Sequence, residues 1–302
     1  MAGFLDEFKG AFTKRDNGLV QLILVNVIVF LVLKVLYVAF SLSQVEVYYE
    51  RIMEQLQLPA ALTALAYKPW TVVTYFFTHE EVFHILFNML FLYWFGRLVD
   101  EYLGNRRLIN LYFLGGLAGG LAYVALYNLV PYFENRLLSA TMLGASGAVY
   151  AVVMGAATLF PNYTFHLLFL GPVRIKWIAL FYLVISFAGV PGPNAGGNIA
   201  HIGGALLGFL YIKMLRRGVD LGSPFDATSD WIRGLFVQKP RPSVKVTYRS
   251  QSKPTYSAYT ATSDGVPDED EVDAILDKIS KSGYESLTRE EKQKLFRASQ
   301  RN

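Results

Sequence analysis

Long runs of apolar residues, each about twenty residues long and nearly free of charge, alternate in this chain with short charged connections. A helix of about twenty mainly apolar residues is long enough to cross the hydrocarbon core of a bilayer and pairs its own backbone groups. Of 302 residues, 53% are hydrophobic and 17% are charged. A soluble domain would spread charge over its whole surface. The pattern therefore predicts an all-α membrane protein with a polar tail.

We expect six transmembrane helices from these runs. The first run has no recognisable small-residue cleavage site, so we expect a retained span and not a removed signal peptide. It contains Lys34, whose ammonium group we expect to reach the nearer interface. The six expected spans are about 18–40, 82–98, 108–128, 143–160, 174–190 and 199–215.

The basic residues of the connections indicate the orientation of the spans. Eleven Lys and Arg residues fall on one side of the expected membrane and three on the other. The positive-inside rule then places both termini in the cytoplasm, and we expect an integral multi-pass protein of a bacterial cytoplasmic (inner) membrane. The pI near 9.0 thus reflects topology and gives no reason to expect nucleic acid as a partner. Trp94 and Trp177 lie near expected cytoplasmic span ends, as interface anchors do.

The segments outside the spans differ in character. The first outer connection, 41–69, mixes charged and apolar residues at helical spacing, which predicts an amphipathic helix. Near the C-terminus, Gly283 is a plausible helix stop, and Thr288 with Glu291 forms a capping box for a second helix. The chain has no cysteine, so disulfides are excluded. We expect a cytoplasmic N-terminus at 1–17, a six-span domain at 18–217, a disordered linker rich in Pro, Ser, Thr and Lys at 218–266, and a small cytoplasmic helical hairpin of unknown partner at 267–302.

Polar side chains occur at one expected depth on three separate spans. His84 and Asn88 begin the second span, Ser146 and Tyr150 begin the fourth, and His201 begins the sixth. Even-numbered spans run inward from the outer face, and residues four apart share a helix face. Each residue alone has a bland explanation, because a histidine or asparagine can hydrogen-bond between helices and a serine among small residues lets helices pack closely.

The combination is what nucleophilic acyl transfer requires. A serine hydroxyl needs a base within hydrogen-bond reach, and the developing oxyanion needs donors that are already in place. An asparagine amide, a histidine N–H and the free backbone N–H groups of a helix's first turn can all donate. Helix packing alone does not predict Ser, Asn and two His together at one depth.

Three motifs make the sequence similar to the rhomboid family of intramembrane serine proteases. They are GASG at 144–147, AHIGG at 200–204 and HILFN at 84–88, within a similarity that extends over about 69–215. The resemblance implies a six-helix rhomboid bundle and a peptidase that cuts in or near transmembrane segments. It assigns Ser146 as nucleophile, His201 as general base, His84, Asn88 and the Ser146 N–H as oxyanion donors, Tyr150 as a ring stacked on His201, and Gly144, Gly147 and Gly204 as supporting residues.

Two further features qualify this resemblance. Many family members carry Trp-Arg in the first outer connection, whereas here Trp70 is followed by Thr71, which puts the anchoring of that connection in doubt. No Asp or Glu lies within the expected spans near His201, so we expect a Ser–His dyad and not a triad. The Gly- and Pro-rich segment 188–198 is expected to cap the site, as it does in the family.

Other functions fit less well. A zinc protease is suggested by His79, Glu80 and His84, but a zincin helix spaces its histidines four apart and here they are five apart. A catalytically silent rhomboid-like factor that binds membrane proteins would typically lack the nucleophile or the base. A transporter would more often show repeated halves. We therefore expect no cofactor and no metal, and as partners transmembrane protein substrates and the lipid bilayer.

Overall fold

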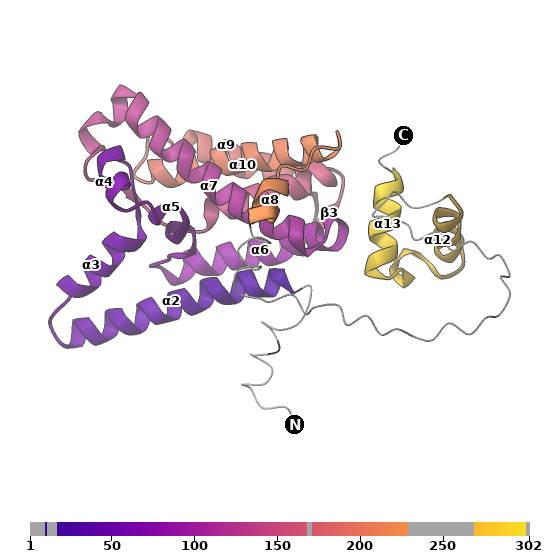
Figure 1. The fold of residues 1–302 in the computed structure, drawn as a ribbon, viewed down its shortest axis with the longest axis horizontal. Coiled ribbons are helices and arrows are strands. Elements are labelled where there is room, and N and C mark those ends of the chain that lie inside the picture. The colour runs from indigo at the N-terminus through magenta and orange to yellow at the C-terminus, as the bar shows by residue number, and fades with distance from the viewer. Residues whose placement is uncertain (1–9, 11–16, 168–170, 229–268, 300–302) are drawn as a thin grey trace, which may run out of the picture. The chain divides into compact units, whose positions relative to one another are not determined.

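The computed structural model describes residues 10, 17–167, 171–228 and 269–299 (Figure 1). It divides into two compact units, Met1–Gly222 and Ser223–Asn302. Most of the predicted linker and of the predicted N-terminal segment lies outside the described residues. The helices of the first unit are α2 (Gly18–Leu42), α3 (Val47–Leu56), α4 (Leu62–Tyr67), α5 (Thr71–Thr74), α6 (Val82–Leu103), α7 (Asn105–Leu129), α8 (Ser146–Leu159), α9 (Ile175–Ala188) and α10 (Ala195–Leu215), with 3-10 turns η1 (Tyr75–Phe77) and η2 (Pro131–Arg136).

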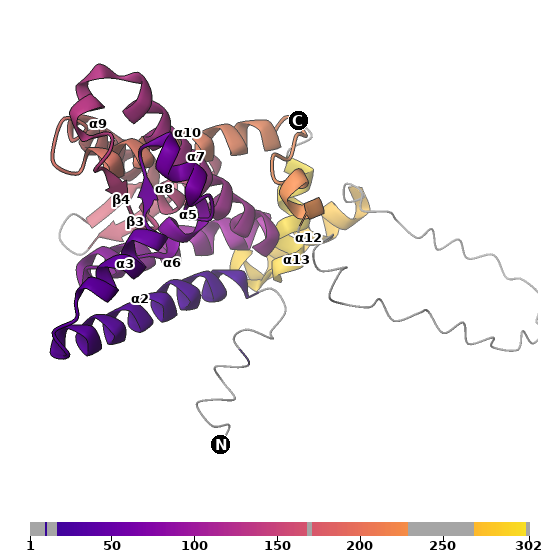
Figure 2. The ribbon, with the colours of Figure 1, turned by 60° about the vertical axis from the view of Figure 1, so that its left-hand side comes forward.

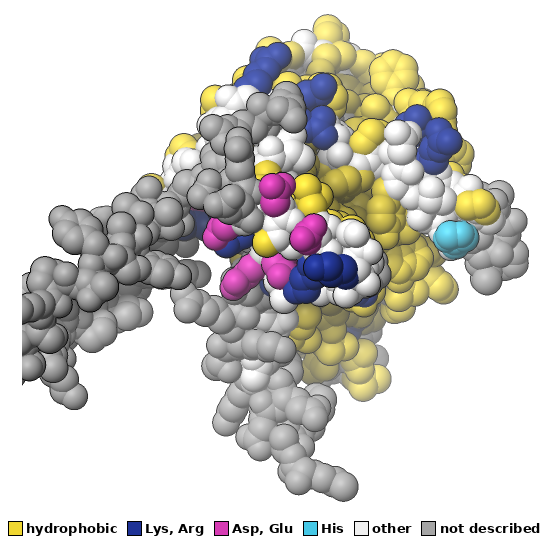
Figure 3. Space-filling model, turned by 90° about the vertical axis from the view of Figure 1, so that its right-hand side faces the viewer, with side chains coloured by type: hydrophobic (Ala, Val, Ile, Leu, Met, Phe, Trp, Pro, Cys, Tyr) yellow, Lys and Arg dark blue, Asp and Glu magenta, His cyan; other side chains and the backbone are white. Residues whose placement is uncertain are grey.

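The six expected spans each coincide with an apolar helix, but these helices differ in length. Among the described residues, α2, α6, α7 and α10 are long and apolar enough to cross a membrane, with 25, 22, 25 and 21 residues. Helices α8 and α9 have 14 residues each, or about 21 Å, against about 30 Å for a hydrocarbon core. A broad surface of hydrophobic side chains is visible in Figure 3. The first unit is thus a helical membrane domain in which two apolar helices are short.

Helix α8 packs against α6, α7, α9 and α10, and ten of its 14 residues are buried. Its small residues allow close approach of its neighbours. A side chain at Gly204 of α10 would overlap the carbonyl oxygen of Gly147, and one at Gly208 would overlap that of Ala151. Close backbone contact of this kind is how transmembrane helices associate where lipid supplies no hydrophobic drive. The contact fixes the middle of α10 against the first two turns of α8.

The fold is mostly helical, as predicted, and its connections also contain two short strand pairs that the sequence analysis did not predict. Strand β1 (Leu58–Pro59) pairs antiparallel with β2 (Thr141–Met142), and β3 (Thr164–Leu167) pairs with β4 (Gly171–Arg174). The second pair forms a ribbon between α8 and α9 (Figure 2). Both pairs lie in connections, where backbone groups that leave a helix must find other partners.

The first outer connection contains two helices, where a single amphipathic stretch was expected. Pro59 lies between α3 and α4, and α3 packs Tyr49 and Met53 against Leu33 of α2. The connection is anchored although Arg is absent after Trp70. The Trp70 indole donates to the Gln55 carbonyl at 2.8 Å.

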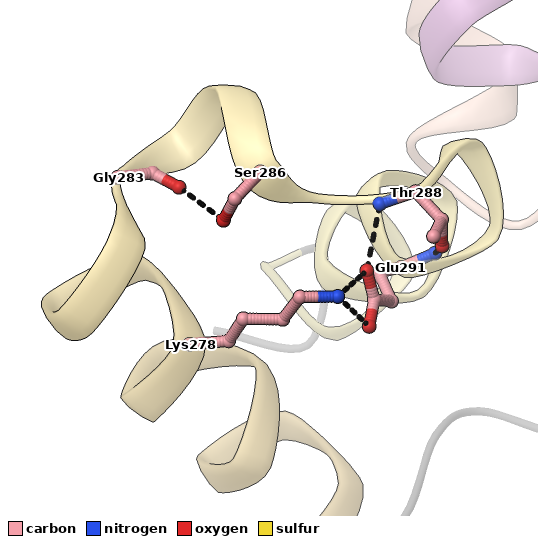
Figure 4. Close-up of polar contacts among 5 residues, drawn as sticks. All are labelled: Lys278, Gly283, Ser286, Thr288 and Glu291. Atoms are coloured by element: carbon pink, nitrogen blue, oxygen red, sulfur yellow. Dashed lines mark hydrogen bonds and ion pairs between the residues drawn. The ribbon is translucent and has the colours of Figure 1, made fainter.

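The second unit is a pair of helices, α12 (Glu269–Ser282) and α13 (Arg289–Ser299), joined by the 3-10 turn η3 (Tyr284–Ser286). The predicted stop is present, because α12 ends before Gly283, whose φ is 76°. The predicted capping box is also present. The Thr288 N–H donates to the Glu291 carboxylate at 2.7 Å, and the Glu291 N–H donates to Thr288 Oγ1 at 3.3 Å (Figure 4). Lys278 of α12 pairs with the same carboxylate and joins the two helices.

Candidate active site

A cavity of about 1300 Å3 opens among α6, α8, α9 and α10. All five polar side chains singled out in the sequence line it, namely His84, Asn88, Ser146, Tyr150 and His201. They come from the N-terminal parts of three helices, as the depth argument predicted. The fold thus brings together residues that are 117 positions apart in the sequence, from 84 to 201.

The central contact of the cavity joins Ser146 and His201. Ser146 is the first residue of α8 and His201 lies two turns into α10. His201 Nε2 and Ser146 Oγ are 2.7 Å apart. At this distance a neutral imidazole can take the proton of the hydroxyl, which is the first requirement of an activated serine.

The His201 ring is held from two sides. Tyr150 stacks on it with ring centroids 4.0 Å apart and planes 10° apart. On its far nitrogen, His201 Nδ1 lies 3.0 Å from Ser186 Oγ, and Ser186 also donates to the Tyr150 hydroxyl at 3.1 Å. The sequence argument assigned orientation of the ring to Tyr150 alone and missed Ser186. The available signal was a hydroxyl inside an otherwise apolar span.

The loop before Ser146 is fixed by two backbone donors. The Gly144 N–H donates to the Tyr75 carbonyl at 2.9 Å, and the Ala145 N–H donates to His79 Nε2 at 3.2 Å. Gly144 has a φ of +116°, and a Cβ there would come within 2.6 Å of His84. Glycine is therefore required both by the backbone conformation and by the adjacent ring.

His79 takes part in this loop as a neutral acceptor. Burial and then the neighbouring His84 lower the pKa of His79 to about 3, so its Nε2 has a free lone pair near neutral pH. His79 precedes the start of α6, with its ring edge-on to that of His84 at 5.2 Å. The helical spacing considered for a zinc site therefore does not apply to it, because His79 is not on the helix.

The side chains expected to hold an oxyanion, those of His84 and Asn88, line the same cavity as Ser146. Asn88 is 6% exposed, and its Nδ2 donates one hydrogen bond to the His84 carbonyl at 2.9 Å. An amide has two N–H donors, so the second is available to the cavity. The first-turn N–H groups of α8 have no acceptor within the helix and carry the positive end of its dipole. Together with the His84 ring, these groups can stabilise a negative charge formed next to Ser146.

Comparison with known families matches two parts of the chain. Residues 66–218 match the rhomboid domain, and residues 264–301 match a family of unknown function, DUF6576. The first match covers about half of the chain and includes every residue that lines the cavity except Gln57. The second covers the helical pair of the second unit.

Three individual relatives are each similar over about half of this chain. The chain is 29% identical to RHOMBOID-like protein 12, mitochondrial, of Arabidopsis thaliana over 49% of this chain and 47% of that protein. It is 32% identical to Rhomboid protein 1, mitochondrial, of Saccharomyces cerevisiae over 48% and 41%. It is 26% identical to Rhomboid protease GlpG of Haemophilus influenzae over 47% and 67%.

These matches limit what can be transferred. The chain spans about half the length of RHOMBOID-like protein 12 and of a further relative, the chloroplastic Rhomboid-like protein 16 of Arabidopsis thaliana. Its apolar helices and the rhomboid match make it an integral membrane protein. The expectation of a bacterial inner membrane is not supported, because proteins named as mitochondrial and chloroplastic match alongside a bacterial one.

Proposed function

The chain belongs to the rhomboid family, and we propose that it is an intramembrane serine endopeptidase that hydrolyses peptide bonds in or near transmembrane segments of other membrane proteins. The observation that carries the proposal is the 2.7 Å separation of His201 Nε2 and Ser146 Oγ in a cavity lined by donors. A rhomboid-like protein that only binds clients has no need of this pair.

Each residue takes part in at least one step of the proposed hydrolysis. His201 Nε2 takes the Ser146 proton while Oγ attacks the substrate carbonyl carbon, and the oxyanion accepts hydrogen bonds from Asn88, His84 and the backbone N–H of Ser146. The intermediate collapses as the protonated His201 gives its proton to the leaving amine. A water molecule, deprotonated by His201, then attacks the acyl-enzyme ester and releases Ser146 with its proton restored.

The topology we propose has six spans, with both termini on the side rich in Lys and Arg. The short length of α8 is consistent with Ser146 lying below the membrane surface that is opposite the basic side, because about 21 Å of helix cannot reach both surfaces. The cavity would then open toward that opposite side and admit water. Pro193 and Asn194 of the expected cap line the same cavity, which is consistent with segment 188–198 covering the site.

Every step of this proposed chemistry is assigned to residues of the first unit. We propose that residues 18–217 form the protease domain, that 218–266 connect it to the pair, and that 267–302 act as a separate segment on the basic side of the membrane. The match of 264–301 to a family of its own supports treating this segment as a module.

The test is labelling and cleavage by the purified full-length protein in detergent. A fluorophosphonate or isocoumarin probe should label Ser146, as located by peptide mapping, and a model single-span substrate should be cut. Ser146→Ala should abolish both while the variant keeps the melting temperature of the wild type. His201→Ala should lose labelling as well, because an unassisted hydroxyl is a poor nucleophile. A folded wild type that binds the substrate without labelling or cutting would instead identify a silent binding factor.

A further inference from the structure

Ser186 is a buried hydroxyl on the least buried helix of the site. Helix α9 exposes most of its large side chains, for example Phe181 at 60% and Phe187 at 73%, whereas Ser186 is 1% exposed. Its Oγ lies 3.0 Å from His201 Nδ1 and 3.1 Å from the Tyr150 hydroxyl. One atom of α9 thus contacts both the general base and the ring stacked on that base.

The directions of these hydrogen bonds follow from counting donors. Ser186 donates its single O–H to Tyr150. Its lone pairs can then accept from His201 Nδ1–H, the tautomer in which Nε2 can take the Ser146 proton. A neutral imidazole with its proton on Nδ1 has its free lone pair on Nε2, which is the atom 2.7 Å from Ser146 Oγ.

We propose that Ser186 is a positioning residue that fixes the tautomer and orientation of His201, in the place that a carboxylate occupies in a Ser–His–Asp triad. The inference rests on the proposed peptidase function and adds a third member to its dyad. A neutral hydroxyl holds the tautomer as an acceptor, but stabilises the protonated ring less than a carboxylate does. The proposed unit therefore consists of Ser146, His201 and Ser186, and Tyr150 stacks on His201 and hydrogen-bonds to Ser186.

Substitutions at this position separate the acceptor role from packing. Ser186→Ala removes the acceptor, Ser186→Cys keeps a similar volume with a weak acceptor, and Ser186→Thr keeps the hydroxyl. We expect kcat to fall about ten- to hundredfold in the Ala and Cys variants, the worth of one hydrogen bond to a group that becomes charged, with KM within about twofold. The Thr variant should recover most of the loss. Thr158→Val is the matched control, because Thr158 Oγ1 bonds only its own helix, at the Met154 carbonyl, and should leave kcat unchanged.

A spectroscopic measurement tests the contact without activity. The chain has four histidines, so the imidazole 15N signals of the full-length protein can be assigned with His201→Gln. We expect protonated Nδ1 and unprotonated Nε2 at His201 in the wild type and in Ser186→Thr, and a mixture of tautomers in Ser186→Ala and Ser186→Cys.

The outcomes distinguish the two hypotheses. If the wild type has no activity but its tautomer depends on Ser186 as expected, the peptidase function fails and the contact stands. Wild-type kcat in both the Ala and Cys variants, or a His201 tautomer that is unchanged in them, would overturn the positioning role. A Cys variant as active as the Thr variant would assign Ser186 to packing.

Discussion

Asn88 offers the sharpest separation between catalysis and helix packing. In the structure its side chain is nearly buried, lines the cavity, and spends one amide N–H on the carbonyl of His84 within its own helix. That carbonyl belongs to the preceding turn of α6, so the bond is local to one helix. The second N–H is the group proposed to bind the oxyanion. Replacing Asn88 by alanine removes both donors at once.

The two donors contribute to different quantities. Losing the bond to His84 should lower the free energy of unfolding by about 0.5–1.5 kcal/mol. Losing an oxyanion donor costs about 10²–10³-fold in kcat where few other donors remain. Here the His84 ring and the first-turn N–H groups of α8 still face the charge. We therefore expect kcat to fall about ten- to hundredfold, or about 1.4–2.7 kcal/mol of transition-state stabilisation, with little change in KM.

The assay is cleavage of the single-span substrate, with kcat, KM and melting temperature measured for each variant. Asn26→Ala is the control, because Asn26 is fully buried and does not line the cavity, and its Nδ2 donates to the Leu22 carbonyl four residues back and to the Tyr112 hydroxyl. It should lower the melting temperature and leave kcat per folded molecule unchanged. Combining Asn88→Ala with His84→Ala should give a loss different from the product of the single losses, because both groups serve one charge. If Asn88→Ala lowers the melting temperature like the control and keeps wild-type kcat, its role is packing and the oxyanion assignment is wrong.

Two further sets of substitutions test the packing of α8 against α10 and the contacts within the helical pair. Gly204→Val places carbon atoms where the Gly147 carbonyl lies, so we expect about 1–3 kcal/mol of destabilisation and loss of Ser146 labelling, whereas Leu206→Val, on the exposed side of α10, should keep labelling. In the pair, Lys278 and the Thr288 N–H lower the pKa of Glu291. The stabilisation that the ionised Glu291 gives the folded pair is therefore fully present above the pKa of Glu291 in the unfolded chain. It is lost as the pH falls through the lower pKa of Glu291 in the folded chain. Glu291→Ala should therefore speed amide exchange over 289–299 near neutral pH, and Glu291→Gln, which keeps the cap without the ion pair, should fall between it and the wild type. Equal exchange in all three proteins would show that neither contact holds α13.

The sequence singled out Ser146 and His201, which the structure places in contact, because few polar groups are tolerated in an apolar span. Ser146 and His201 were each conspicuous against their surroundings, and span parity placed them at one depth. The helix ends were also close to the prediction, for example Ser146–Leu159 within the expected 143–160. Periodicity and the cost of burying polar groups are local properties, so one sequence is enough to apply them.

The contacts that were missed depend on tertiary packing. Ser186 shows no partner within its own span, and its role appears only when α9 places it against α8 and α10. The pairing of Leu58 with Met142 joins segments 84 residues apart, and nothing in either dipeptide predicts the other. His79 was considered as a helical residue beside His84, whereas it lies in the turn before α6 and binds the nucleophile loop. In each case the sequence shows which residue is present, but only the tertiary fold shows which residue it contacts.

The small residues around Ser146 reconcile two demands that oppose each other. A helix that begins within a membrane leaves its first N–H groups without water, which is costly unless other groups accept them. The fold meets part of this cost by crowding α7 and α10 onto the glycines and alanines of α8 and by binding Gly144 and Ala145 to Tyr75 and His79. Ser146, the first residue of α8, lines the cavity instead. The N–H groups at the start of α8, which lack partners within the helix and so disfavour folding, are thus the same groups proposed to donate to a charge at Ser146. A longer α8 that reached the membrane surface would expose these N–H groups to water.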